Sequence, residues 1–252
     1  MKKIMEITIK GKAGYEIPCI CEIPDNTDLI VIAIHGFGGN KNTGAIRRMC
    51  KKLLEFNKGM IALDLPCHGE SNAPKDAFLL KNVMSDIDDV VSFLENEYPK
   101  ADIAFFATSF GAYATLLYLT ENKERLISKA VCRSSAIDME KVLLQNIIKE
   151  KAEELEKNGY INCSDHGMLR VSREYRDELT ENRLFDIFEK NEFCDYLMIH
   201  GTSDELAPIE DARAFAERFE INMIEVKGAD HRFKKEHDLE QLINYAMSFF
   251  LQ

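Results

Sequence analysis

The amino-acid sequence predicts an α/β fold, in which helices cover both faces of a mainly parallel β-sheet. Short apolar runs of strand length alternate with longer segments whose apolar residues recur at helical spacing. Residues 28–35 (DLIVIAIH) form a continuous apolar run between turn residues, which is typical of a central strand buried on both faces. The alternation favours parallel strands, because two parallel strands need a crossover connection and that connection is usually a helix.

The expected elements follow in order along the chain, with no internal repeat and no low-complexity tract. Two opening strands are joined by a glycine-containing turn, and residues 78–97 carry apolar side chains at the spacing of an amphipathic helix. The expected strands are 3–10, 15–23, 28–35, 60–63, 103–107, 128–132, 196–200 and 223–226, and the expected helices are 44–56, 78–97, 110–120, 208–219 and 236–250.

Residues 133–195 interrupt this alternation, because they contain no obvious buried strand. Residues 138–157 are charged and helical in pattern, 159–171 contain the turn residues of a short hairpin, and 172–190 are again helical. We therefore expect a single domain over 1–252, with a core of 1–132 and 196–252 and one insertion at 133–195. The interrupted apolar pattern predicts an insertion that packs less tightly than the core.

Composition and charge exclude several classes of protein. The 252 residues include 43 acidic and 32 basic side chains, a net charge of −11, and 46% are hydrophobic, enough for a large core. A nucleic-acid partner is not expected, since a phosphate-backbone binder needs a basic face. The chain start lacks a signal-peptide pattern and no run of 18 apolar residues occurs, so we expect a cytoplasmic protein without a membrane span.

The seven cysteines are expected to be buried free thiols. Their number is odd and their spacing is not that of a disulfide framework. Cys19 and Cys21 could suggest a metal pair, but a C-x-C on an alternating strand simply places both thiols on one face. His68, His166 and His237 have no ligand-like spacing, so no metal and no organic cofactor is expected.

The strongest local motif is FFATSFGAYA at residues 105–114. An apolar strand runs through Ala107 and Thr108 into Ser109, and a helix follows at once. Such a tight turn needs small residues on both sides of the central serine, whose hydroxyl it exposes above the sheet. The segment matches the G-x-S-x-G nucleophile turn, except that Ala107 replaces the first glycine. Ser109 is therefore the candidate nucleophile, although the pattern alone is common by chance.

Two further segments supply an acid and a base in the expected order. The strand at 196–200 ends in HGTSD, which places Asp204 at the carboxyl edge of the sheet, and GAD precedes His231 on a loop at the same edge. The order Ser, Asp, His is that of hydrolases with a strand–serine–helix turn and differs from the order in the two main protease folds. Asp230 is a rival acid, but adjacent side chains on a loop rarely face each other, and Glu205 beside Asp204 is expected to be a solvated neighbour.

A glycine loop, HGFGG at residues 35–39, follows the first buried strand. At that place a loop can direct a backbone N–H toward a developing oxyanion. The alternatives are an ordinary glycine turn or a phosphate-binding loop, and the second lacks the Lys-Ser/Thr pair that should follow it.

Together these motifs resemble those of the α/β-hydrolase superfamily across nearly the whole chain. The resemblance is carried by HGFGG, DLPCHGES, ATSFGAY, HGTSDELAP and GADHRF. The short core and the compact insertion resemble the bacterial feruloyl/cinnamoyl esterase-like group, while monoacylglycerol-lipase-like and serine-aminopeptidase-like relatives share the same motifs. Three departures stand out: Ala107 for Gly, Cys67 where relatives have Gly, and a charged CRSSA segment at 132–136 where relatives are apolar.

The resemblance implies a fold and a site. The fold would be an eight-stranded, mostly parallel sheet with residues 133–195 as a lid over Ser109. The N–H groups of Phe37 and Phe110 would form the oxyanion hole. Asp204 and His231 would complete a catalytic triad.

The expected activity is hydrolysis of a carboxylic ester, such as a hydroxycinnamoyl or other small ester, through an acyl-serine intermediate. Alternatives with the same triad are a serine peptidase or amidase and a thioesterase, and a non-catalytic binding protein on this scaffold is a further one. The expected partner is a small-molecule ester, while the oligomeric state is not indicated by the sequence.

Arg133 follows a strand beside the Ser109 strand, so it should border the mouth of the site. A buried cation is costly unless it is paired. It could pair with an acid of the insertion such as Asp138 or Asp165, or bind a carboxylate or polar acyl substituent of the substrate. The apolar residues of the following helix, which are Met139, Leu143, Leu144, Ile147 and Ile148, fit either core positions or an acyl pocket.

Overall fold

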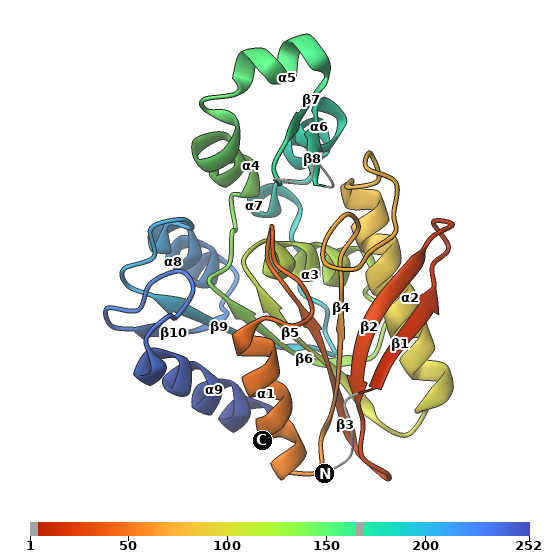
Figure 1. Ribbon diagram of the computed structural model, residues 1–252. Helices are drawn as coiled ribbons and strands as arrows, with labels where there is room; N and C mark the ends of the chain where they lie inside the picture. The colour runs from red at the N-terminus through yellow and green to blue at the C-terminus, as the bar shows by residue number, and fades with distance from the viewer. Residues whose placement is uncertain (1–4, 165–168) are drawn as a thin grey trace.

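The computed structural model describes residues 5–164 and 169–252. One sheet of eight strands runs in the order β1-β2-β4-β3-β5-β6-β9-β10, with helices on both faces (Figure 1). Strands β1 and β2 pair antiparallel, as do β2 and β4, and the remaining neighbours are parallel. The predicted α/β class and the eight-stranded, mostly parallel sheet are confirmed.

The sheet strands lie within one to two residues of the predicted ranges. They are β1 (Met5–Lys10), β2 (Glu16–Glu22), β3 (Leu29–Ile34), β4 (Gly59–Leu63), β5 (Asp102–Thr108), β6 (Ile127–Arg133), β9 (Asp195–Gly201) and β10 (Asn222–Val226). The helices that cover the sheet are α1 (Gly44–Glu55), α2 (Leu80–Glu97), α3 (Phe110–Glu121), α8 (Ile209–Arg218) and α9 (Glu236–Phe250). The first two residues of the predicted strand 3–10 lie outside the described residues.

Strand β3 is buried along its whole length because both faces of the sheet are covered. Its side chains alternate between two apolar clusters, with Ile30, Ile32 and Ile34 in one and Leu29, Val31 and Ala33 in the other. Helices α2 and α3 contribute to the first cluster, and α1 and α9 to the second. The carboxyl ends of the parallel strands consequently meet at one edge between two packed layers.

The insertion projects beyond that edge between β6 and β9 (Figure 1). It consists of α4 (Met139–Leu143), a π-helical turn (Leu144–Ile148), α5 (Ala152–Asn158), β7 (Tyr160–Asn162), β8 (Arg170–Ser172), α6 (Arg173–Glu181) and α7 (Leu184–Ile187). Strands β7 and β8 form the predicted hairpin. Buried insertion residues such as Leu143, Leu155 and Tyr175 belong to the same cluster as α2 and α3, so the insertion shares the core of one face.

The insertion helices are shorter than predicted. The expected helix at 138–157 is divided into α4, the π-helical turn and α5, and the expected helix at 172–190 ends at Glu181 before α7 begins. At the second break the Asn182 side chain donates to the Glu178 carbonyl, and the Asn182 carbonyl accepts from the Tyr113 hydroxyl. A side chain that competes for backbone partners in this way ends a helix.

The cysteines are free, and all but Cys163, which is partly buried, are buried. Cys19 and Cys21 lie in the same apolar cluster, and burial raises the pKa of the Cys21 thiol to about 11. Across residues 5–164 and 169–252, no group of three or more His, Cys, Asp or Glu side chains is arranged to hold a metal ion. None of the helices described combines the length and the apolar character needed to cross a membrane.

Candidate active site

Ser109 occupies a strained turn between β5 and α3. Its backbone has φ 55° and ψ −116°, a conformation that residues other than glycine rarely adopt. The Ser109 N–H donates to the Arg133 carbonyl at 2.9 Å, and the Ser109 carbonyl accepts from the Tyr113 N–H at 3.1 Å. Strain of this kind persists only where the surroundings fix it, and here it places the hydroxyl at the start of a helix.

The small residues around Ser109 are required by close backbone approach. A Cβ atom on Gly111 would lie 2.5 Å from the His35 carbonyl oxygen, and one on Gly36 would lie 3.1 Å from the Ser109 Cβ. Ala107 is fully buried and pairs with Ile34 on one side. The extra methyl group at residue 107 is therefore accommodated within the sheet, and that departure from the motif does not disturb the turn.

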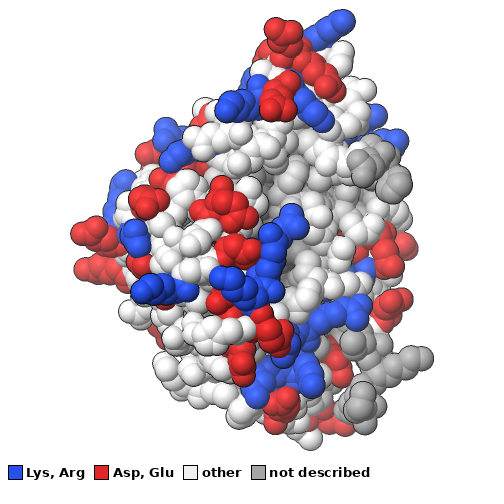
Figure 2. All heavy atoms as spheres, turned by 60° about the vertical axis from the view of Figure 1, so that its left-hand side comes forward, with Lys and Arg blue, Asp and Glu red and all other residues white. Residues whose placement is uncertain are grey.

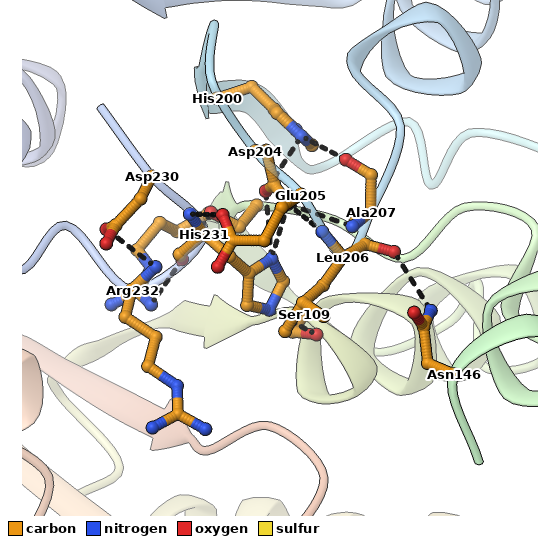
Figure 3. A network of polar contacts seen from close by, with 12 residues as sticks. Ser109, Asn146, His200, Asp204, Glu205, Leu206, Ala207, Asp230, His231 and Arg232 are labelled. Atoms are coloured by element: carbon orange, nitrogen blue, oxygen red, sulfur yellow. Dashed lines mark hydrogen bonds and ion pairs between the residues drawn. The ribbon is translucent and has the colours of Figure 1, made fainter. Parts of the chain in front are cut away.

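His231 and Asp204 meet Ser109 from two loops that follow β10 and β9 (Figure 3). The His231 Nε2 atom lies 3.1 Å from the Ser109 Oγ atom. The His231 Nδ1 atom lies 2.9 and 2.8 Å from the two carboxylate oxygens of Asp204. The three residues proposed from the sequence thus form one continuous chain of hydrogen bonds, which is the arrangement needed to deprotonate a serine.

Asp204 is held by more groups than His231 alone. The N–H groups of Leu206 and Ala207 donate to its Oδ1 atom at 3.0 and 2.8 Å, and the His200 Nε2 atom lies 3.2 Å from its Oδ2 atom. Burial alone would raise the pKa of Asp204, but the hydrogen bonds from His200 and His231 outweigh it and hold this pKa well below its usual value. Asp204 therefore stays ionised opposite the imidazole.

His200 is a contributor that the sequence reasoning did not single out. Its ring is fully buried, and its Nε2 atom is shared between Asp204 and the Ala207 carbonyl at 3.0 Å (Figure 3). Its position in HGTSD, four residues before the acid, was the available signal.

The glycine loop after β3 is braced by two histidines. The His68 Nε2 atom accepts the Gly38 N–H at 3.0 Å while its Nδ1 atom contacts the Pro66 carbonyl. The His35 Nε2 atom likewise accepts the Leu65 N–H at 3.1 Å. An imidazole that accepts at one nitrogen and donates at the other must be neutral.

The loop leaves the two expected oxyanion donors free. The N–H groups of Phe37 and Phe110 make no hydrogen bond within residues 5–164 and 169–252. Phe110 is the first residue of α3, and Phe37 directly follows Gly36, which lies against Ser109. A buried ion pair fixes the other end of the loop, since the Lys41 Nζ atom lies 2.6 Å from Asp64 and both side chains are almost fully buried.

Because of the two bracing histidines, the free energy of unfolding should depend on pH. Burial lowers the pKa of His68 to about 3 and that of His35 to about 4. Below pH ~6.5 the unfolded chain takes up protons that the folded chain cannot, so the free energy of unfolding should fall as the pH drops from ~6.5 toward 4. His68→Gln keeps an acceptor for the Gly38 N–H but removes one of the protons that the unfolded chain takes up. The free energy of unfolding of this variant should therefore fall less steeply with decreasing pH, by ~1.4 kcal/mol per pH unit. Urea unfolding at pH 4 to 7.5 measures this, and parallel curves for the two proteins would contradict it.

The rival acids do not contact the imidazole of His231. Asp230 accepts hydrogen bonds from the N–H groups of Arg232 and Lys234 and lies 3.4 Å from the Lys234 ammonium. Glu205 is exposed, and the hydrogen bond that it accepts among the described residues comes from the backbone N–H of His231, at 3.4 Å. Both remain neighbours of the site, as expected.

Arg133 does not form the ion pair with Asp138 that was one of the two expectations. The Asp138 side chain instead accepts the Lys141 N–H at the start of α4, and Asp165 lies outside the described residues. The Arg133 Nη2 atom donates to the His231 carbonyl at 3.1 Å, and its guanidinium lies over the Phe233 ring. Arg133, the last residue of β6, is thus turned toward the loop that carries His231 and Phe233.

A cavity of about 720 Å³ lies over Ser109. The glycine loop, Ser109, Arg133, His231 and the start of α1 line it, and the insertion adds Met139, Val142, Asn146 and Ile147. Of the helix residues that could be core or pocket, Met139 and Ile147 line the cavity, Leu143 and Ile148 are core, and Leu144 is exposed. A second cavity, of about 910 Å³, lies elsewhere on the protein. None of the described residues that line it is a serine or a histidine.

A serine on a strand–helix turn, with an acid and a histidine on later loops at the carboxyl edge of an eight-stranded sheet, defines the α/β-hydrolase class. Comparison with known families agrees. The chain belongs to the family described as serine aminopeptidase, S33, whose family model matches residues 25–186. No curated protein sequence matches the chain.

Solved structures with the same fold include three hydrolases. Est1E from Butyrivibrio proteoclasticus, in a structure with bound ferulic acid, is 20% identical, with a TM-score of 0.83 over 97% of this chain and 98% of that one. A putative hydrolase from Agrobacterium vitis S4 is 19% identical, with a TM-score of 0.81 over 98% of each chain. An esterase from Pyrococcus furiosus is 20% identical, with a TM-score of 0.72 over 98% of this chain and 90% of that one. The expected resemblance to α/β hydrolases with esterase-like relatives is confirmed.

Proposed function

We propose that this protein is a serine hydrolase that cleaves a carboxylic ester, of hydroxycinnamoyl or other small type, through an acyl-Ser109 intermediate. The observation that carries the proposal is the hydrogen-bonded series from Ser109 through His231 to Asp204 at the base of a cavity. Est1E, whose structure holds ferulic acid, and the Pyrococcus esterase support an ester as the substrate.

Each group has a role in the chemistry. The His231 Nε2 atom takes the Ser109 proton as the oxygen attacks the ester carbonyl, and Asp204 stabilises the resulting imidazolium. The N–H groups of Phe37 and Phe110 stabilise the tetrahedral oxyanion, with each donor worth on the order of 3 kcal/mol in comparable hydrolases. His231 then gives the proton to the departing alcohol. Water, deprotonated by the same imidazole, releases the acid from Ser109.

An aminopeptidase is the second candidate, because that activity gives the matched family its description. An aminopeptidase must hold the α-ammonium group of its substrate, and carboxylates are the usual partners of a bound ammonium. In the described part of the chain no Asp or Glu lines the cavity over Ser109. The cavity chemistry therefore favours an ester.

The experiment that decides between these functions is a substrate panel on one preparation. It contains p-nitrophenyl acyl esters, methyl hydroxycinnamates, monoglycerides, acyl thioesters and aminoacyl amides, with fluorophosphonate labelling to count reactive serines. Turnover of an ester at least ten times faster than that of any amide or thioester supports the proposal. Faster amide turnover would make the protein a peptidase, and an unlabelled, inactive protein would be a binding protein.

We also propose that residues 133–195 act as a lid, because α4 and the π-helical turn supply one wall of the cavity. In the π-helical turn Leu144 is exposed and Ile148 is buried in the core. Only part of this turn is therefore packed against the rest of the protein. Backbone hydrogen exchange is expected to be faster in 139–158 than in 29–34 and 102–108. Equal protection of these segments would rule out an opening lid.

A further inference from the structure

The charge of the cavity over Ser109 is opposite to that of the protein. The chain has a net charge of −11, yet within the described residues the cavity lining holds three cations, Arg133, Arg232 and Lys234, and no carboxylate. Figure 2 shows basic side chains, with acidic ones between them, across the middle of this face, beside an uncharged hollow below the projecting insertion. In an acidic protein, a cavity wall of this composition favours an anionic ligand.

The three cations are incompletely neutralised. Arg133 is only 6% exposed, and its Nε atom has no hydrogen-bond partner in the described part of the protein. Arg232 is exposed, and among residues 5–164 and 169–252 nothing pairs with its guanidinium, which extends away from the polar network in Figure 3. Lys234 has a loose partner in Asp230 at 3.4 Å.

The nearby acids are already occupied. Asp204 is buried behind His231 and accepts from both histidines and from two backbone N–H groups. Glu205 accepts from the His231 N–H. Neither lines the cavity, so a ligand there meets the cations first.

The order of residues around His231 indicates which part of an ester would meet these cations. The leaving oxygen must lie within hydrogen-bond distance of the His231 Nε2 atom to receive its proton. The alcohol part of the ester therefore starts beside the loop that carries Arg232 and Lys234. A planar guanidinium with free N–H groups suits a carboxylate, which it can bind through two parallel hydrogen bonds.

We propose that the natural substrate is an ester whose alcohol part bears a carboxylate, which Arg232 binds with Lys234 at its side, while Arg133 adds positive charge from the cavity wall. This inference rests on the proposed ester hydrolysis and specifies its substrate class. The reaction releases a carboxylic acid from Ser109 and a carboxylate-bearing alcohol, so the enzyme consumes the product of an acylation of a hydroxy acid.

The test compares kcat/KM for three probes: phenyl acetate, 4-carboxyphenyl acetate with the anion on the alcohol part, and phenyl hemisuccinate with the anion on the acyl part. Each anionic probe is expressed as a ratio to phenyl acetate, so that comparing variants cancels differences in intrinsic reactivity. The variants are Arg232→Met and, as the matched control, Lys235→Met, an exposed cation of the same loop that does not line the cavity.

The 4-carboxyphenyl ratio is expected to fall about tenfold in Arg232→Met, because a charge-assisted bidentate pair is lost, and to stay unchanged in Lys235→Met. An equal fall of this ratio in both variants would mean that any positive charge on the loop has the same effect, and it would overturn the proposal. A fall confined to the hemisuccinate ratio, or an unchanged ratio in Arg232→Met, would overturn it as well. If the wild-type protein hydrolyses none of the three probes while it cleaves amides, the proposed ester hydrolysis fails instead.

Discussion

Ser109→Ala is expected to keep the fold and to lower ester turnover by several powers of ten, given losses of ~10⁶ for nucleophile knockouts in comparable triads. Alanine retains the Cβ atom that packs against Gly36, and the turn is fixed by backbone hydrogen bonds rather than by the hydroxyl. The measurements are steady-state kcat on the best ester of the panel and the circular dichroism of the variant.

His231→Ala should cause a loss of similar size, and the double variant should be little worse than either single one, because the members of a triad act as a unit. Ser203→Ala is a suitable control, since Ser203 is exposed on the loop beside Asp204. A folded Ser109→Ala protein that kept more than a few per cent of the activity would refute the assignment of the nucleophile.

Asp204→Asn is expected to lower kcat by about 10⁴, the effect of the equivalent change in a serine protease triad. The amide is close in shape to the carboxylate, so the loop should persist. Its NH₂ group, however, can donate to the His231 Nδ1 atom and favour the tautomer with the proton on Nε2, which cannot accept the Ser109 proton.

The control variants for this prediction are Asp230→Asn and Glu205→Gln, the two neighbouring acids that do not contact the imidazole. Each should retain kcat within about threefold, because Glu205 is exposed, Asp230 is partly exposed, and the contacts of both are with backbone N–H groups or the Lys234 ammonium rather than with the imidazole. A larger loss in Asp230→Asn than in Asp204→Asn would transfer the role of the acid to Asp230.

The parts of the site that can be predicted from the sequence are those in which a short continuous segment contains both a strand and the functional residue that follows it. The turn around Ser109 and the loop with Asp204 each follow a largely buried strand, and the loop with His231 follows β10, of which only Val226 is buried; parallel strands bring their carboxyl ends to one edge. Their mutual distances follow from the sheet. The fold class and the strand positions could be predicted for the same reason.

The supporting contacts could not be predicted, because they join residues that are distant in the chain. The bond from Gly38 to His68 and the pair of Lys41 with Asp64 depend on how two loops pack, and no periodicity encodes that. Arg133 lines the cavity over Ser109, but its partner is a carbonyl oxygen on the histidine loop. A backbone acceptor has no side-chain signature in a sequence.

The helix breaks in the insertion were missed for a similar reason. The pattern at 172–190 is helical throughout, and the contact between the Tyr113 hydroxyl and the Asn182 carbonyl, which accompanies the Asn182 side-chain bond at the break, joins residues that are distant in the chain. Tertiary contacts override local preference most easily in short amphipathic helices, whose stability comes mainly from packing.

The insertion leaves and rejoins the sheet at neighbouring strands, since β6 pairs directly with β9 and Arg133 lies opposite Ile199. The sheet is therefore complete without the intervening segment, and the positions of Ser109, Asp204 and His231 do not depend on its length. The segment closest to the site is short: the Ser134 hydroxyl donates to the His231 carbonyl, and the Ala136 N–H donates to the Ser109 carbonyl. Beyond Ala136 the insertion can therefore change, in evolution or in the laboratory, and alter substrate range while the chemistry stays constant, as long as the replacement covers the core that Leu143, Leu155 and Tyr175 now cover.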